Sequence, residues 1–225
     1  MIRHIIFDLD GTLVDTAPHC AGIINAMLSE RRSPRLVSAG DARIHLTRGG
    51  HQLVAALLGE ECGDLAAELA DFRARYVALP TPQDCLFPGV GDSLVELAGL
   101  GVGLAVCSNK PQHLCEKTIG ELGLGEAISV IAGSRADRAL KPAPDLALLA
   151  LSALGAEPGD CLYVGDSEVD LLTARAAGLP FLFVSYGYAE PGWSPAGLAT
   201  IDRFEDVIGL VRDARAAGPD LPQVA

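Results

Sequence analysis

Near its beginning the chain reads Ile5-Ile6-Phe7-Asp8-Leu9-Asp10-Gly11-Thr12, a short apolar segment that ends in two carboxylates. The apolar run predicts an inner strand of a parallel sheet, because such strands are buried on both faces. Carboxylates are almost never fully buried unless they are paired or bind a metal. Gly11 permits a turn at the sheet edge where open α/β folds bind ligands. We therefore expect Asp8 and Asp10 to face a ligand crevice, with an ordinary Asp-Gly turn as the alternative.

The length and charge of the chain restrict the class of protein. A chain of 225 residues can form one large domain or two smaller ones with a substantial core. No apolar run approaches the ~18 residues needed to cross a membrane, and no signal peptide is evident. The net charge of −12, without a basic cluster, argues against nucleic acids and anionic membranes as partners.

The cysteines and histidines follow neither a disulfide pattern nor a zinc-binding pattern. The six cysteines form no CxxC pair, which is typical of reduced, buried cysteines in a cytosolic protein. The five histidines show no HxH or HExxH spacing, so a zinc site is not expected. We therefore expect a cytoplasmic protein.

The segment that follows the first predicted strand has a helical pattern. Apolar residues recur at helical spacing over residues 18–28, 52–58 and 65–79. No strand pattern occurs there, and Pro80-Thr81-Pro82 marks a break. We predict a small helical module at residues 16–82, with hinges near residues 13–17 and 80–88.

From Pro88 onward, helix and strand patterns alternate. The expected strands cover residues 102–107, 128–132, 161–164 and 181–184, and the expected helices cover residues 90–100, 111–122, 145–154, 168–177 and 204–216. Such alternation predicts βαβ units and a parallel sheet. The predicted fold is therefore α/β, with a Rossmann-like three-layer core at residues 1–15 and 83–225 and the helical module inserted into it.

Two further segments carry polar groups at the predicted strand ends. The second strand is followed by Ser108-Asn109-Lys110-Pro111, and Pro111 suits the first turn of a helix, whose N-terminus attracts anions. Lys141 is one of only three lysines and lies in the loop before a later helix. An ordinary capped helix and a solvated loop lysine are the structural alternatives.

Carboxylates follow the strand at residues 161–164. Asp166 lies directly at its end, and Asp170 has capping-box spacing from Ser167. Several carboxylates in one crevice repel one another unless a cation lies between them. Oxygen ligands without nearby histidine or cysteine suit Mg²⁺, and a cation beside Lys141 would make the pocket positive enough for phosphate.

Together these motifs resemble those of the haloacid dehalogenase-like hydrolase superfamily. The resemblance rests on Asp8-x-Asp10-Gly11-Thr12, Ser108, Lys141-Pro142 and Gly165-Asp166-xxx-Asp170, in the family's order and at its approximate spacing. These motifs span nearly the whole chain, and the helical insertion resembles the family's small cap domain. Within the superfamily, residues 8–18, 108–111 and 186–188 look most like those of phosphoglycolate phosphatases.

The resemblance implies a Mg²⁺-dependent phosphatase that passes through an aspartyl-phosphate. Asp8 would attack phosphorus, and Asp10 would protonate the leaving oxygen and then activate water. Lys141 would act in catalysis, and the implied phosphate-binding residues are Thr12, Ser108, Asn109 and Lys141. The implied metal ligands are Asp8, the carbonyl of Asp10 and Asp166, with Asp170 supporting them without direct coordination.

Substrate selection is expected in the cap, at Thr47-Arg48-Gly49-Gly50-His51. Gly49 and Gly50 allow close backbone approach, and Arg48 could bind a carboxylate, with a solvated arginine at a helix start as the alternative. These features favour a small phosphorylated metabolite such as 2-phosphoglycolate. A phosphosugar such as N-acetylmuramate 6-phosphate, a sugar-phosphate mutase and a non-catalytic phospho-ligand binder stay open, as does the choice between monomer and homodimer.

Overall fold

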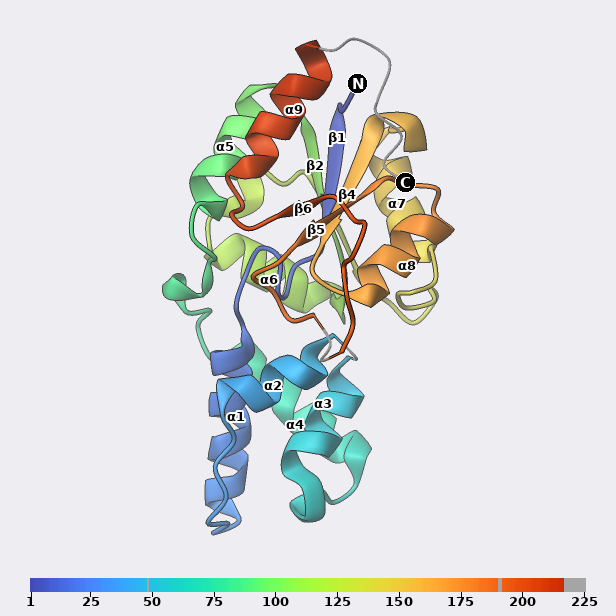
Figure 1. Cartoon of the computed structure of the whole chain (residues 1–225). Coiled ribbons are helices and arrows are strands. Elements are labelled where there is room, and N and C mark those ends of the chain that lie inside the picture. The colour runs from blue at the N-terminus through green and yellow to red at the C-terminus, as the bar shows by residue number, and fades with distance from the viewer. Residues whose placement is uncertain (48, 190–191, 217–225) are drawn as a thin grey trace.

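The apolar strand near the N-terminus lies in the middle of a six-stranded parallel sheet (Figure 1). The computed structural model describes residues 1–47, 49–189 and 192–216. The sheet has the order β3-β2-β1-β4-β5-β6. Its strands are β1 (His4–Phe7), β2 (Gly103–Pro111), β3 (Val130–Ser134), β4 (Cys161–Gly165), β5 (Phe181–Val184) and β6 (Thr200–Ile201). The predicted parallel sheet is confirmed, and β6 was missed because two residues are too few to show a period.

Helices cover both faces of this sheet (Figure 1). Ile5 and Phe7 point to one face and Ile6 to the other, because side chains alternate along a strand. The helices packed with Ile5 and Phe7 are α5 (Val90–Gly99), α6 (Gln112–Glu121) and α9 (Asp206–Ala216). Those packed with Ile6 are α7 (Asp145–Leu154) and α8 (Glu168–Ala176). The predicted three-layer core is therefore confirmed.

The helices of the inserted segment form a cap beside the carboxyl ends of the strands (Figure 1). They are α1 (Ala17–Glu30), α2 (Ala39–Leu46), α3 (Gly50–Leu58) and α4 (Leu65–Ala78). Their shared hydrophobic cluster includes Ile24, Leu58, Phe72 and Tyr76. Short 3₁₀ helices occur at Gly59–Glu61, Gln83–Cys85, Leu124–Glu126 and Pro158–Asp160. Within the described residues, no helix has both the length and the apolar character needed to span a membrane.

Helix α2 was not predicted from the sequence. It buries a single residue, Ala42, so its sequence carries no apolar period. A capping box between Ser38 and Asp41 stabilises its start instead. The spacing of these two residues was the available signal.

The start of helix α6 differs from its prediction. Strand β2 continues to Pro111, with a register shift against β3 after Cys107. Pro111 has an extended conformation and precedes the helix, which begins at Gln112. The prediction that Pro111 lies in the first helical turn was therefore wrong, and Ser108 lies within the strand.

The chain crosses between sheet and cap through two adjacent segments. Val14 and Leu86 form an antiparallel bridge. The Asp15 amide donates a hydrogen bond to the Cys85 carbonyl at 2.7 Å. These segments coincide with the predicted hinges, while the boundaries at residues 15/16 and 82/83 stay a prediction.

Candidate active site

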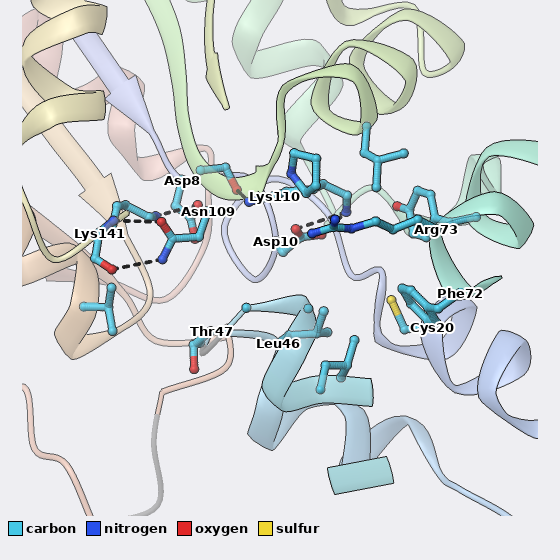
Figure 2. A pocket seen from close by; sticks show the side chains of 18 of the residues that line it. Asp8, Asp10, Cys20, Leu46, Thr47, Phe72, Arg73, Asn109, Lys110 and Lys141 are labelled. Carbon is cyan, nitrogen blue, oxygen red and sulfur yellow. Dashed lines mark hydrogen bonds and ion pairs between the residues drawn. The ribbon is translucent and has the colours of Figure 1, made fainter. Parts of the chain in front are cut away.

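Asp8 and Asp10 follow strand β1, on either side of the fully buried Leu9. Figure 2 shows that Asp8 lies near Lys141, whereas Asp10 lies near Lys110. The turn after them needs glycine, because Gly11 has a φ of 95°. A Cβ atom there would also lie 2.2 Å from Asp166 Oδ2. The turn therefore brings strand β1 into tight contact with the end of strand β4.

Lys141 joins the carboxylates at this edge. Its Nζ atom lies 2.8 Å from Asp8 Oδ1 and 2.6 Å from Asp170 Oδ1. It also donates a hydrogen bond to the Cys107 carbonyl at 3.1 Å. Burial acts to lower the pKa of Lys141, but the charges of Asp170 and Asp8 raise it well above its ordinary value. Lys141 is therefore a buried cation held between two carboxylates.

Asn109 fixes the backbone of Lys141. The Lys141 amide donates to Asn109 Oδ1 at 2.8 Å, and Asn109 Nδ2 donates to the Lys141 carbonyl at 3.1 Å. Ser108 is buried, and its Oγ accepts a hydrogen bond from the Lys110 amide at 3.3 Å. Asn109 thus positions Lys141, in addition to lining the predicted phosphate site.

The three buried carboxylates of Asp8, Asp166 and Asp170 converge, with one oxygen of each within 4.8 Å of the others. Burial and the charge of Asp170 raise the pKa of Asp8 to about 7, and they raise the pKa of Asp166 well above its ordinary value. Although Asp8 Oδ1 lies close to Lys141, no well-oriented hydrogen bond from the described residues reaches it. Such oxygens fit a hard divalent cation, whereas the Asp10 side chain lies outside this group.

Asp166 is fully buried and held by two donors. Thr12 Oγ1 donates to Asp166 Oδ1 at 3.1 Å, and the Tyr188 amide donates to Asp166 Oδ2 at 2.5 Å. A Cβ atom at Gly187 would lie 2.2 Å from the Asp166 Cβ. Thr12, predicted to bind phosphate, therefore contacts the predicted metal ligand.

Ser167 caps helix α8 and forms one half of the predicted capping box, because the Asp170 carboxylate bonds to the Ser167 hydroxyl and not to its amide. The Asp170 amide donates to Ser167 Oγ at 3.3 Å, and Ser167 Oγ donates to Asp170 Oδ2 at 2.6 Å. The Tyr163 hydroxyl donates to Asp170 Oδ1 at 3.1 Å. Tyr163 was not predicted, because its place in an apolar strand indicates only a core residue.

Asp10 has its own cation, Lys110. Lys110 Nζ donates to the two Asp10 carboxylate oxygens at 2.8 and 3.1 Å, and Thr16 Oγ1 donates at 2.5 Å. The same ammonium lies 4.8 Å from the centre of the Tyr76 ring in the cap. No role for Lys110 was predicted from the sequence, although its rarity as one of three lysines was an available signal.

A cavity lies between the strand ends and the cap (Figure 2). The predicted site residues that line it are Asp8, Asp10, Gly49, Gly50, Ser108, Asn109 and Lys141. Thr12, Asp166 and Asp170 are not among the described lining residues. Arg48 lies outside the described residues. The cavity is also lined by Lys110, Arg73 and Tyr76, which were not predicted from the sequence to lie there.

A contact at Asp15 ties the cap to the core. The Tyr188 hydroxyl donates to Asp15 Oδ1 at 2.6 Å, and the Arg43 guanidinium forms an ion pair with the other carboxylate oxygen. Burial acts to raise the pKa of Asp15, but hydrogen bonds from Arg43 and Tyr188 lower it overall. Asp15 therefore connects helix α2 with the loop that also holds Asp166.

Comparison with known sequences identifies the family. The model of haloacid dehalogenase-like hydrolases matches residues 2–178. A phosphoglycolate phosphatase of Xanthomonas campestris is 35% identical over 187 residues, covering 83% of this chain and 84% of that protein. A phosphoglycolate phosphatase of Rhodospirillum rubrum is 38% identical over 216 residues, covering 91% of this chain and 88% of that protein.

Solved structures share the fold. A predicted phosphoglycolate phosphatase from Haemophilus somnus has a TM-score of 0.84 and 25% identity, covering 93% of this chain and 98% of that one. CbbY from Rhodobacter sphaeroides, solved with xylulose 1,5-bisphosphate, has a TM-score of 0.74 and 27% identity, covering 92% of this chain and 96% of that one. The predicted resemblance is therefore confirmed, and the chain belongs to the haloacid dehalogenase-like hydrolase family.

Proposed function

We propose that this protein is a Mg²⁺-dependent phosphatase that hydrolyses 2-phosphoglycolate to glycolate and phosphate. The observation that carries the proposal is one cavity containing Asp8, Asp10 and Lys141, with Lys141 Nζ 2.8 Å from Asp8. A buried nucleophile beside a cation, with a second carboxylate two residues away, suits phosphoryl transfer to a side chain. The names of the relatives from Xanthomonas and Rhodospirillum support the choice of substrate.

The reaction divides into two displacements at phosphorus. An oxygen of Asp8 attacks phosphorus and forms a new P–O bond, while the ester P–O bond breaks and the leaving oxygen takes a proton from Asp10. A water molecule then attacks the same phosphorus and gives its proton to Asp10. The bond between Asp8 and phosphorus breaks, which releases phosphate and restores both carboxyl groups.

The neighbouring residues position these two carboxyl groups. Lys110 and Thr16 hold the Asp10 side chain through the hydrogen bonds described above. Lys141, oriented by Asn109, places positive charge beside Asp8, where the phosphoryl oxygens would bind together with Ser108. Such preorganised charges stabilise a transition state without reorganising when the reaction occurs.

The predicted cation would be held by Asp8, Asp166 and the Asp10 carbonyl, with Asp170 supporting Lys141 and Ser167. Bound Mg²⁺ supplies charge neutralisation for a carboxylate and a phosphate in close contact. Among the described residues, Lys141 is the cation paired with this group of three buried carboxylates, so their excess negative charge supports a second cation there. The all-oxygen donor set favours Mg²⁺ over softer metals.

The cap supplies the remaining predicted substrate contacts. Gly49 and Gly50 line the cavity, and Arg48 precedes them in the sequence. The six cysteines are all free, which supports the predicted cytoplasmic location, and either a monomer or a homodimer is compatible with this site.

A panel of phosphate esters tests the proposal. The purified protein with Mg²⁺ should release phosphate from 2-phosphoglycolate with a higher kcat/KM than from N-acetylmuramate 6-phosphate or glucose 1-phosphate. Preference for the phosphosugar would reassign the substrate. Isomerisation of glucose 1-phosphate with little free phosphate would indicate a mutase, and failure to convert any ester would indicate a binding protein.

A further inference from the structure

The described cations that line the cavity are Lys110, Lys141 and Arg73, and they differ in their partners. Lys141 is paired with Asp8, and Lys110 is paired with Asp10. Arg73, on helix α4, is half-buried, and it makes no ion pair or hydrogen bond with any described residue. Figure 2 shows its side chain extending from the cap across the cavity toward Asp10.

This lack of a partner contrasts with other arginines of the cap. Arg31, Arg35, Arg43 and Arg75 each form an ion pair, with Glu68, Glu61, Asp15 and Glu30 respectively. In a chain with a net charge of −12, carboxylate partners for a surface arginine are plentiful. Arg73 instead directs its charge into the cavity, where a guanidinium without a partner suits an incoming anion.

A second unpartnered group lies on the same helix. Tyr76 is only 2% exposed, lines the cavity, and has a hydroxyl without a hydrogen-bond partner among the described residues. Residues three apart on a helix are neighbours, so Arg73 and Tyr76 belong to one face of α4. Buried polar groups are normally hydrogen-bonded, so an unsatisfied hydroxyl beside an unpaired guanidinium indicates a place for an oxygen-rich ligand group.

Arg73 and Tyr76 lie on the side of the cavity where the leaving group of the substrate would bind. The Tyr76 ring lies 4.8 Å from Lys110 Nζ, and Lys110 binds Asp10 at 2.8 Å. Asp10 is the residue that would protonate the leaving oxygen, so the cap groups lie on the leaving-group side of the reaction. Phe72 and Leu69 also line the cavity, and their apolar side chains strengthen a charge pair formed beside them.

We propose that Arg73 binds a carboxylate carried by the leaving group, with the Tyr76 hydroxyl as an additional donor. The inference rests on the proposed phosphatase function and names the residue that would select phosphate esters whose leaving group carries a carboxylate. A guanidinium binds the two oxygens of a carboxylate side by side, which fixes the direction of the leaving group as well as its charge.

The test compares two esters that differ at one end. In 2-hydroxyethyl phosphate, an uncharged CH₂OH group replaces the carboxylate of 2-phosphoglycolate. In Arg73→Met, the ratio of kcat/KM for the acidic ester to that for the neutral ester should fall by about 10- to 100-fold, mainly through KM, as expected for the loss of charged hydrogen bonds. Arg73→Lys should restore part of the ratio.

Arg75→Met is the matched control. It removes an arginine from the same helix, but one whose guanidinium pairs with Glu30 and Asp71. This variant should keep the wild-type ratio. If Arg73→Met lowered kcat/KM equally for both esters, Arg73 would have a structural role only. If kcat/KM fell only for a bisphosphate ester tested alongside them, Arg73 would bind a second phosphate. Either result overturns the proposal.

A binding measurement separates this proposal from the proposed function. Calorimetric titration uses the phosphonate analogue of 2-phosphoglycolate, in which a CH₂ group replaces the ester oxygen, so no turnover is needed. Arg73→Met should weaken its binding by about 10- to 100-fold. If the wild type hydrolysed no ester but bound the analogue more tightly than Arg73→Met, only the phosphatase assignment would be overturned. If the wild type and Arg73→Met bound the analogue equally, the role of Arg73 would be overturned.

Discussion

The two walls of the cavity differ in how their charges are satisfied. On the core wall, Lys141 is paired with Asp8 and Asp170, and Lys110 is paired with Asp10. On the cap wall, Arg73 has no described partner and is accompanied mainly by apolar side chains. The cations of the core wall are therefore already paired with carboxylates, whereas the cation of the cap wall is left for a ligand.

This difference suggests a division of roles, with the reaction on the core wall and substrate selection on the cap wall. Removing Lys141 or Lys110 leaves buried carboxylates without their cation, so the core wall tolerates little change at its lysines. A cap residue without a partner can be replaced at a smaller cost to the fold. Substrate preference can therefore change through the cap while the reaction centre stays the same.

The largest effect is expected on the core wall, from Asp8→Asn. The variant lacks the attacking oxygen, so phosphate release should fall by about 10⁵-fold or more, as for other lost nucleophiles. Melting of the metal-free variant should occur at or above the wild-type temperature, because a neutral amide avoids the repulsion from Asp170. Substantial Mg²⁺-dependent activity in Asp8→Asn would remove Asp8 from the reaction and break the contrast between the walls.

A smaller effect is expected from pH in the metal-free protein. Burial and Asp170 raise the pKa of Asp8 from 3.8 to about 7. Between these values the folded protein binds more protons than the unfolded chain, so the free energy of unfolding falls as pH rises. This loss amounts to at most about 4 kcal/mol, complete above the folded pKa.

Mg²⁺ should reverse this loss by neutralising the carboxylates. The rise in melting temperature on adding Mg²⁺ should be larger at about pH 7.5 than at about pH 5, where protons compete for the same oxygens. Asp8→Asn is the control and should show a weaker pH dependence. Equal stabilisation by Mg²⁺ at both pH values would contradict a cation site at these carboxylates.

The smallest of these effects is expected from Lys110→Met, which tests the contact between the walls. Lys110 touches Asp10 of the core and the ring of Tyr76 in the cap. Its loss should lower kcat by about 10- to 100-fold, because Asp10 loses its orientation, and should cost about 2 kcal/mol in urea unfolding. The contribution to stability stays modest because Asp10 also faces the cavity and keeps its bond from Thr16.

Lys117→Met provides the comparison for Lys110. Lys117 is half-buried, pairs with Glu121 on helix α6 and donates a hydrogen bond to the Leu79 carbonyl at 2.8 Å. Its loss should therefore cost about 1 kcal/mol, but it should leave kcat unchanged because Lys117 is not paired with Asp10. Equal effects of the two substitutions on kcat would show that the contact at Asp10 has no special role in the reaction.

Much of the core wall was predictable because it depends on local signals. An apolar strand predicts burial, and a carboxylate at its end needs a partner, so Asp8, Asp10 and Asp166 could be identified from sequence alone. The alternation of helices and strands then placed these residues at one edge of a parallel sheet. Parallel strands all end at the same edge, which makes this inference independent of packing detail.

The cap wall was less predictable because side-chain direction on a helix depends on what the helix packs against. Helix α2 shows no apolar period, and Tyr76 has the same spacing as its core neighbours on α4. Arg73 and Arg75 are separated by one residue, yet one lines the cavity and the other pairs with Glu30. The one local difference is Asp71, which lies four residues before Arg75 and pairs with it, whereas the residue four before Arg73 is Leu69.

The sequence by itself therefore determined the parallel α/β core, the inserted helical cap and the carboxylates at the strand ends, since each follows from local periodicity and from the cost of burying charge. The tertiary structure alone decided which cation meets which carboxylate. Lys141 with Asp8, Lys110 with Asp10 and Thr12 with Asp166 are pairs separated by 100 or more residues. Such contacts depend on strand order and on the docking of the cap, which no local pattern encodes.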